Sequence, residues 1–300
     1  MAYLSNDPRS RLASASSGAN ASSYGASEYA NFYESPPQVQ DALGKTWMTR
    51  GQNFLVAYSL LEAGARIRRN EQSQEHVILL HDDNMSLIVR AQGETLEDSG
   101  RSLIVVPPGD SEIEMLSPGR VVEVIPTVDE ELNSMCVNAV SYVEPKPNVA
   151  PLVLWPEPVG GFKLRRYSID VDPEPGRFGR IWRTTNLMIN YTEPRQGPRD
   201  VTKMSPHTHD DFEQGSLCLE GGFVHHLRWP WGTDSRQWQE DEHQICAGPS
   251  LAVIPPLIVH TSQQISQGVN QLVDLFGPPR VDFSNMEGWV LNADEYPMAE

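Results

Sequence analysis

Short apolar runs separated by turn-forming residues follow one another along most of the chain. Three of them read "SLIVV" at 102–106, "SLCLEG" at 216–221 and "SLAVI" at 250–254, and turn signals such as "HDDN" at 81–84 lie between such runs. Runs of this length, many of them β-branched and bounded by Gly, Pro, Asn or Asp, predict strands. Only residues 37–47, "PQVQDALGKTW", have a pattern that indicates a helix. The predicted fold class is all-β.

Two parts of the sequence repeat each other. "SLIVVPPGDSE" at 102–112 matches "SLAVIPPLIVH" at 250–260, and residues 68–80 match residues 205–219. Such a repeat predicts two small sandwich or barrel units, which we place at 37–146 and 160–300, joined by a proline-rich linker at 147–159. Residues 1–36 are rich in Ser, Ala and Gly and can bury little apolar surface, so we expect a flexible tail or an arm there.

The charge balance excludes several classes of partner. The chain has 23 Lys and Arg against 40 Asp and Glu, a formal net charge of −17. Nucleic acid and anionic membranes require clustered basic residues, so neither is expected as a partner. Three cysteines without CxxC spacing favour a reducing compartment, and no run approaches 18 apolar residues. We therefore expect a cytoplasmic protein.

The segment 206–221, "PHTHDDFEQGSLCLEG", places two histidines one residue apart, shortly before an acid and an amide. In an extended chain His207 and His209 point to the same side, about 7 Å apart along the backbone, and can converge on one ion. Six of the eight histidines lie between 207 and 260, and His260 ends the repeated motif "IPPLIVH". Imidazole is a common ligand of divalent metals, so the sequence predicts one metal site in the second unit.

The order His207-x-His209, an acid or amide after a short loop, a strand ending in "LEG", and then "IPPLIVH" resembles the two motifs of the cupin superfamily. The resemblance implies a bicupin, that is, two tandem cupin double-stranded β-helix (jelly-roll) barrels. It also implies one divalent metal ion in the C-terminal barrel, bound by His207, His209 and His260. Fe is the metal it implies first, with Mn, Ni or Zn as alternatives. A homodimer is the oligomer that it suggests.

Glu213 and Gln214 are both candidates for the fourth ligand, because strand alternation turns one of two neighbours inward and the sequence does not say which. With Glu213, three imidazoles would leave a divalent ion one net positive charge, an arrangement common for oxygen-activating iron. With Gln214, both charges would remain to polarise a substrate oxygen or a water molecule.

Three functions follow from the resemblance. The first is an Fe(II)-type dioxygenase, an oxidoreductase acting on a small oxygen-bearing substrate such as a carboxylate. The second is a redox-neutral isomerase, lyase or hydrolase of a sugar-acid-like substrate. The third is a non-catalytic binding or storage bicupin.

The strand predicted at 223–228 supplies further candidates. If His226 faces inward, Arg228 does too, and the pair could carry a proton and hold a carboxylate. If His225 faces inward instead, it packs with the apolar residues of that face. Arg183 is another candidate for the interior of the C-terminal barrel around the metal site, which we call the cup. The alternative for Arg183 is an outward salt bridge. The tryptophans near this strand could cover the cup or pack between the units: Trp229, Trp231 and Trp238.

The first unit lacks a comparable set of ligands. By the repeat, its counterparts are Asn70, Gln72, Glu75 or His76, and Glu112. With at most one imidazole, we expect this barrel to be metal-free and structural. The second unit also departs from the cupin pattern, because Leu257 stands where the family has Gly. The turn there must avoid a positive φ or store strain.

Overall fold

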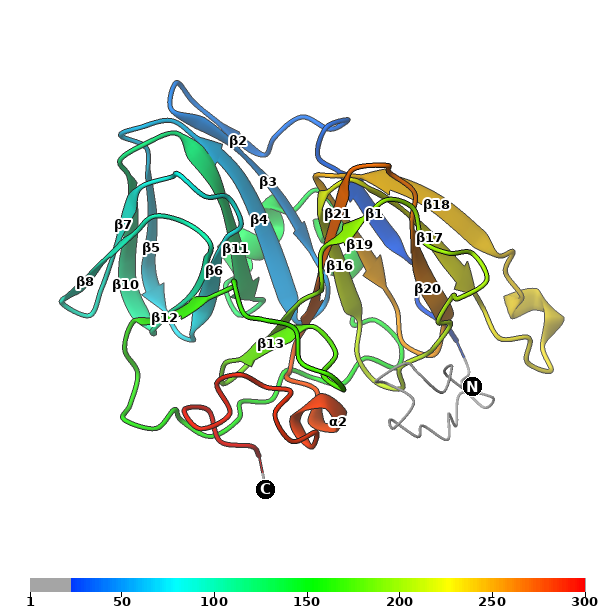
Figure 1. Ribbon diagram of the computed structural model, residues 1–300. Coiled ribbons are helices and arrows are strands. Elements are labelled where there is room, and N and C mark those ends of the chain that lie inside the picture. The colour runs from blue at the N-terminus through cyan, green and yellow to red at the C-terminus, as the bar shows by residue number, and fades with distance from the viewer. Residues whose placement is uncertain (1–22, 300) are drawn as a thin grey trace.

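The computed structural model describes residues 23–299 and consists of two β-barrels side by side (Figure 1). Most of the predicted tail, residues 1–22, lies outside the described part. Four antiparallel sheets form four layers: a four-stranded sheet, two seven-stranded sheets in the middle, and a three-stranded sheet. Within residues 23–299, no helix is long and apolar enough to cross a membrane. The prediction of an all-β fold is confirmed.

The N-terminal barrel is built from two sheets with the strand orders β12-β9-β6-β11-β4-β3-β2 and β5-β10-β7-β8. Its strands are β2 (Val39–Gln40), β3 (Gly44–Arg50), β4 (Phe54–Leu61), β5 (Arg66–Gln72), β6 (His76–Leu80), β7 (Leu87–Ala91), β8 (Glu94–Asp98), β9 (Ser102–Val106), β10 (Gly109–Met115) and β11 (Gly119–Pro126). The helical expectation for residues 37–47 is wrong, because β2 and β3 pair there as a hairpin. A short helix, α1 (Glu130–Met135), and a 3₁₀ turn, η3 (Ala139–Tyr142), follow β11.

The C-terminal barrel repeats this plan with the orders β1-β19-β16-β21-β14-β13, with β15 beside β21, and β18-β17-β20. Its strands are β13 (Arg180–Arg183), β14 (Met188–Tyr191), β15 (Arg195–Gln196), β16 (Gln214–Glu220), β17 (Gly222–Arg228), β18 (Glu242–Ala247), β19 (Ser250–Ile254), β20 (Val259–Gln264) and β21 (Val269–Phe276). A 3₁₀ turn, η4 (Ser235–Gln237), interrupts the β17–β18 loop, and α2 (Val281–Ser284) follows β21.

Each barrel lends an edge strand to the other half's sheet. β1 (Glu28–Asn31) precedes the N-terminal barrel in sequence but pairs with β19 of the C-terminal barrel. β12 (Arg165–Ser168) belongs to the second half of the sequence but pairs with β9 of the N-terminal barrel. In Figure 1 the blue β1 accordingly lies beside the orange-brown β19. Residues 28–31 of the expected tail are therefore an edge strand, which covers backbone groups that would otherwise be exposed.

The largest core lies between the barrels, where the two seven-stranded sheets pack face to face. Alternate residues of β6, such as Val77 and Leu79, meet Leu217 and Leu219 of β16 in this core, and Phe54 of β4 lies in it as well. The other face of each sheet looks into its own barrel. The N-terminal interior is packed with apolar side chains, including Ile78, Leu80, Leu87, Val89, Ile104 and Ile113. The C-terminal interior is therefore the better candidate for a functional site.

Candidate metal centre

Three histidines converge inside the C-terminal barrel. His207 and His260 form an antiparallel bridge, in which each backbone N–H donates to the other residue's carbonyl at 3.0 and 2.8 Å. The ring centroids of His207 and His209 lie 4.3 and 4.6 Å from that of His260. One ring nitrogen from each residue lies within 4.8 Å of the other two. Imidazoles separated by 51 to 53 positions in the chain are thus brought to a common centre.

Backbone contacts fix the orientation of two of these rings. The Nδ1–H of His207 donates to the carbonyl of Ser205 at 3.0 Å, and the Nδ1–H of His260 donates to that of Ile258 at 2.9 Å. A carbonyl can only accept, so both rings carry their proton on Nδ1 and present the lone pair of Nε2. This is the arrangement by which backbone carbonyls orient metal-binding histidines.

The buried ring of His209 is suited to binding a metal ion. It is 4 % exposed, and neither ring nitrogen has a well-formed hydrogen bond within residues 23–299. Burial, followed by the nearby His260, Arg280 and His207, lowers its pKa well below the usual value, although the Gln214 side chain opposes that shift. A buried imidazole that is neutral and poorly satisfied is the state in which the ring binds a metal.

Leu257 links the two histidine motifs through a strained turn. Its φ is +68°, a left-handed conformation that is unusual for a branched side chain. Its N–H donates to the carbonyl of His209 at 2.6 Å. Of the two outcomes expected for this position, the structure shows the strained one. The strain costs of order 1–3 kcal/mol and is stored beside the three imidazoles.

The register of β16 turns Gln214 inward and Glu213 away. Gln214 Nε2 donates to Ser216 Oγ at 2.9 Å and to Asp274 Oδ1 at 3.1 Å, both inside the barrel. Glu213 accepts hydrogen bonds from the N-terminal half instead, as described below. Gly215, Leu217 and Leu219 face the inter-barrel core, so Glu213 shares that side of the strand and Gln214 lies on the inner side. The alternative in which Glu213 is the fourth metal ligand is therefore wrong.

A cavity of about 650 Å³ extends from His207 and His260 toward the loop that follows β14. His207, Gln214, His260 and Asp274 lie on its wall, and so does Arg280, which is 7 % exposed. Its lining contains five basic side chains (Arg177, Arg195, Arg199, Lys203 and Arg280) and four carboxylates (Glu174, Glu193, Asp200 and Asp274). The cavity is thus slightly positive before any metal is added, in a chain of net charge −17.

Arg280 is held rigidly at this cavity. Its Nε and Nη2 donate to Asp282 at 3.0 and 2.6 Å. The guanidinium lies over Phe283, 3.5 Å from the ring centroid, and 4.9 Å from the centroids of Phe212 and Phe276. Phe212 in turn stacks on His209 at 4.6 Å. A fixed cation close to the imidazoles suits an anionic ligand.

His226 and Arg228 do not line the cavity, so the expectation that they face inward to carry a proton and hold a carboxylate is wrong. His226 faces outward and bonds to His243 and Gln263 at 2.7 and 3.0 Å. Arg228 is exposed and paired with Asp241. His225 faces inward instead, fully buried, and its Nδ1 bonds to Ser262 Oγ at 2.9 Å. Burial lowers its pKa to about 3, so it is neutral near pH 7.

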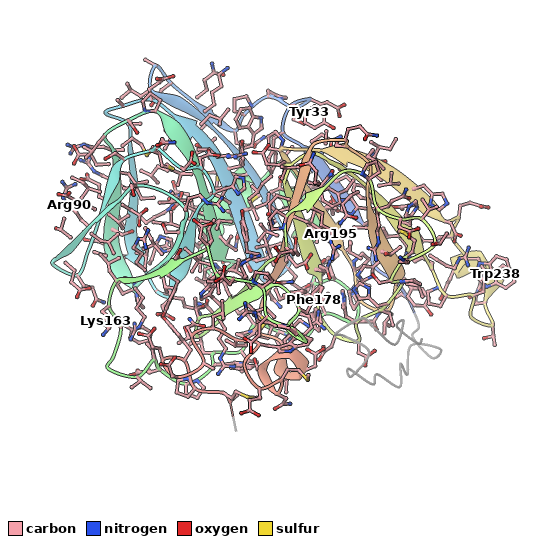
Figure 2. All side chains as sticks on the ribbon, in the orientation of Figure 1. Tyr33, Arg90, Lys163, Phe178, Arg195 and Trp238 are labelled. Carbon is pink, nitrogen blue, oxygen red and sulfur yellow. The ribbon has the colours of Figure 1, made fainter. Side chains whose placement is uncertain are left out.

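Arg183 and the tryptophans are also placed away from the cavity. Arg183 is buried, donates to the carbonyl of Tyr296 and lies over the ring of Trp155. Trp229 packs with Leu227, Ile254 and Ile258. Trp231 and Trp238 stack on each other at 4.5 Å and are 72 % and 43 % exposed. Figure 2 shows Trp238 at the outer end of the C-terminal barrel, apart from the cavity-lining Phe178 and Arg195.

The counterparts in the N-terminal barrel do not converge. Asn70 is exposed, Gln72 donates to Asp129, and Glu75 turns toward the other barrel, which leaves His76 facing inward. Glu112 lies on the outer face of β10 and pairs with Arg66, Arg68 and Arg90. Within residues 23–299, the only other trio with close ligand atoms is His81, Asp82 and Glu220, where Arg120 forms salt bridges to both acids.

Comparison with known proteins supports the fold. No family model matches the sequence, and no curated protein sequence matches it. Among solved structures, AerE from Microcystis aeruginosa is similar with a TM-score of 0.53 at 8 % identity, over 85 % of this chain and 99 % of that one. Oxalate decarboxylase from Lactobacillus farciminis, in a formate complex, gives 0.56 at 14 % over 84 % and 86 %.

Oxalate decarboxylase from Bacillus subtilis, in the form of a serine-to-alanine point mutant, is similar with a TM-score of 0.56 at 11 % identity, over 88 % of this chain and 80 % of that one. Another structure of the same enzyme is described in terms of its Mn(II) centres. At these identities the likeness concerns the fold alone. The chain has the bicupin fold, and the resemblance noted in the sequence is confirmed at that level.

Two cavity residues were absent from the sequence-based candidates. Asp274 sits in the apolar strand β21 and accepts from Gln214 and from Asn190, whose Nδ2 lies 3.1 Å away. A lone acid inside the run "QLVDLF" was the available signal. Arg280 follows Pro278 and Pro279 after the end of β21. Its place in the cavity depends on how the chain turns after β21.

Proposed function

We propose that this chain is a metal-dependent enzyme in which one divalent ion, held by His207, His209 and His260, serves a reaction of a small anionic, oxygen-bearing substrate. The observation that carries the proposal is the convergence of three buried or half-buried imidazoles, two of them oriented by backbone carbonyls. Gln214 would be the fourth protein group at the ion. When bound, such an ion would act as a Lewis acid on a substrate oxygen or water.

The donor set favours a redox-neutral lyase, isomerase or hydrolase. No carboxylate joins the three histidines within 4.8 Å among the described residues, so a divalent ion would keep both charges. This differs from the two-histidine, one-carboxylate set of many Fe(II) oxygenases. The formate complex and the Mn(II) centres described for oxalate decarboxylases support a small carboxylate substrate and manganese as one metal to test.

Arg280 takes over the role that the sequence assigned to Arg228 or Arg183. Its guanidinium is fixed by Asp282 and by three phenylalanine rings, and it lines the same cavity as His207 and His260. A substrate carboxylate there would form a charge-assisted hydrogen bond in a largely buried place. Asp274 would keep the Gln214 amide in one orientation, because it accepts from Gln214 Nε2.

An Fe(II) dioxygenase is the second candidate. Three imidazoles also suit iron, and Phe212 and Phe276 place apolar rings 4.6 and 6.3 Å from the His209 ring, where a nonpolar gas could approach. A binding or storage protein is the third, and it would require no turnover.

An activity screen separates the three functions. The full chain would be loaded separately with Mn(II), Fe(II), Ni(II) and Zn(II) and offered small mono- and dicarboxylates, 2-oxo acids, 1,3-diketones and sugar acids. Products would be followed by NMR with an oxygen electrode in parallel. We expect metal-dependent turnover that continues without oxygen. Turnover that consumes oxygen would establish the dioxygenase instead, and a chain that binds no metal would contradict both enzyme functions.

For any substrate found, Arg280→Ala should raise KM at least about tenfold while metal content stays unchanged, because a buried charge-assisted contact is lost. Arg228→Ala is the matched control and should leave KM unchanged, since Arg228 is exposed and pairs with Asp241. Equal KM values in the two variants would remove Arg280 from the substrate site.

A further inference from the structure

Glu213 connects the candidate metal centre of the C-terminal barrel to the N-terminal barrel. It is 3 % exposed, and its Oε2 accepts from the backbone N–H of Gln52 at 2.6 Å. Its Oε1 accepts from the hydroxyl of Tyr142 at 3.1 Å. Gln52 lies in the β3–β4 loop and Tyr142 in η3, so both donors belong to the N-terminal half. A C-terminal residue is therefore clamped by the neighbouring barrel.

A second clamp of the same kind, the mirror clamp, holds a glutamate of the N-terminal half with groups of the C-terminal half. Glu75 immediately precedes β6, as Glu213 precedes β16, and is fully buried. Its Oε2 accepts from the N–H and Oγ1 of Thr185 at 3.1 and 2.9 Å, and its Oε1 accepts from the hydroxyl of Tyr296 at 2.8 Å. Thr185 and Tyr296 belong to the C-terminal half. Each clamp consists of a buried glutamate, a backbone N–H and a tyrosine from the opposite half.

Only the Glu213 clamp adjoins the candidate metal centre. The residue before it, Phe212, stacks on His209 at 4.6 Å, and the residue after it, Gln214, reaches into the cavity. In the mirror clamp, the residue after Glu75 is His76, which points into an interior without converging ligands. The two clamps are thus alike in chemistry and different in what they hold.

The β3–β4 loop also holds the segment that carries Arg280. Asn53 is 5 % exposed, and its Nδ2 donates to the carbonyl of Gly277 at 2.9 Å and to that of Ala150 at 2.8 Å. An added Cβ on Gly277 would lie 2.9 Å from the carbonyl oxygen of Asn53, so the two backbones are in close contact. Residues 51–53 therefore contact both Glu213, which precedes Gln214 on the cavity wall, and Gly277, which lies three residues before Arg280.

We propose that the N-terminal barrel positions the metal centre of its neighbour, through the contacts of Gln52 and Tyr142 with Glu213 and of Asn53 with Gly277. Glu213 is a positioning residue: it touches no ligand atom, but it fixes the backbone that carries Phe212 and Gln214. This inference rests on the proposed function, since it presupposes a metal at the three histidines. It gives the N-terminal barrel a role beyond stability.

The test compares Glu213→Gln with Glu75→Gln in the full chain, using Co(II) as the probe. Both variants should lower the Tm of the metal-free protein by similar amounts. Glu213→Gln alone should weaken Co(II) binding, by about tenfold, near the lower end of the effect of losing a group that orients a ligand. It alone should change the visible absorption of bound Co(II), which reports ligand geometry.

Tyr142→Phe and Tyr296→Phe provide a milder pair that keeps both glutamates. Tyr142→Phe should weaken Co(II) binding about threefold, and Tyr296→Phe should leave it unchanged. Because neither substitution replaces a glutamate, this result would show that the weaker Co(II) binding of Glu213→Gln does not arise from the altered carboxyl group alone. This pair also tests the positioning role if the glutamate variants do not fold. Equal Co(II) affinities and spectra within each pair, with normal wild-type binding, would overturn the positioning role alone. Absence of Co(II) binding by the wild type would overturn the proposed function and this inference together.

Discussion

Strands β6 and β16 hold equivalent places in the two barrels, and they differ on the face that looks inward. On the face toward the other barrel both are apolar, as the shared core shows. On the inner face β6 carries Ile78 and Leu80, whereas β16 carries Ser216 and Cys218 at the same positions. The face between the barrels maintains the fold in both halves, so the inner face could diverge without loss of the barrel.

The buried carboxylates of the two interiors differ in the same way. Glu123 lies opposite Ile78, and Asp274 lies opposite Ser216. Glu123 is bound by the guanidinium of Arg69 at 3.1 and 2.7 Å, so the N-terminal barrel contains its own cation. Asp274 accepts from the side-chain amides of Gln214 and Asn190. The comparison teaches that one barrel is filled by apolar side chains and an internal ion pair, while the other surrounds a polar cavity lined by His207, His260 and Arg280.

The largest effect is expected for the ion pair of the N-terminal barrel. Arg69→Ala leaves the buried Glu123 without its partner and should lower the free energy of unfolding by about 3–5 kcal/mol. The double variant Arg69→Met with Glu123→Leu should recover most of that loss, because an apolar pair of similar size can replace a buried ion pair. Urea unfolding measures both. A single variant as stable as the wild type would mean that the pair is not buried.

Adjacent residues of β16 test the two faces of one strand. Leu217→Ala should cost about 2–5 kcal/mol, because it empties part of the core between the barrels. Ser216→Ala should cost about 1 kcal/mol, because it removes only the bond from Gln214 Nε2. Chemical denaturation is the measurement. Similar losses for the two variants would contradict the separation of structural and functional faces.

His76 makes the stability of the filled barrel depend on pH. Burial and the nearby Arg69 lower its pKa to about 3, whereas an unfolded histidine has a pKa near 6.5. Between pH 6.5 and 3 the unfolded chain therefore binds a proton that the folded chain does not, so stability falls as pH falls, by up to about 1.4 kcal/mol per unit. His76→Gln should reduce this slope. An unchanged slope would show that His76 titrates normally.

The smallest effect is expected outside the barrel. His226→Ala should change stability by no more than about 0.5 kcal/mol and should leave metal content and any turnover unchanged, because His226 bonds to His243 and Gln263 on the outer face. A loss of activity in this variant would restore the proton-transfer role first expected for it.

The sequence predicted the features that depend on local pattern. Alternation and turn residues indicated the strands, the repeat indicated two barrels, and the spacing of His207, His209 and His260 indicated where to look for a metal. The choice between Glu213 and Gln214 required the structure, because the sequence does not show that the Leu217 and Leu219 face of β16 packs against the other barrel.

Other features were not visible because they depend on contacts distant in sequence. The outward turn of His226 and Arg228 is set by pairing with β18 and β20. The reciprocal clamps of Glu75 and Glu213 join residues more than 70 positions apart. Single glutamates in a chain with 40 acidic residues carry no local signal of such a role.

Elemental analysis of the purified full chain, reconstituted with Mn(II), Fe(II), Ni(II) or Zn(II) and freed of excess metal, tests the central claim most directly. The wild type should hold about one equivalent per chain, as expected for one histidine site. His260→Ala should lose it, whereas Gln72→Ala in the filled barrel should keep it. A wild type that stays empty with every metal, or equal losses in the two variants, would contradict a metal centre in the C-terminal barrel.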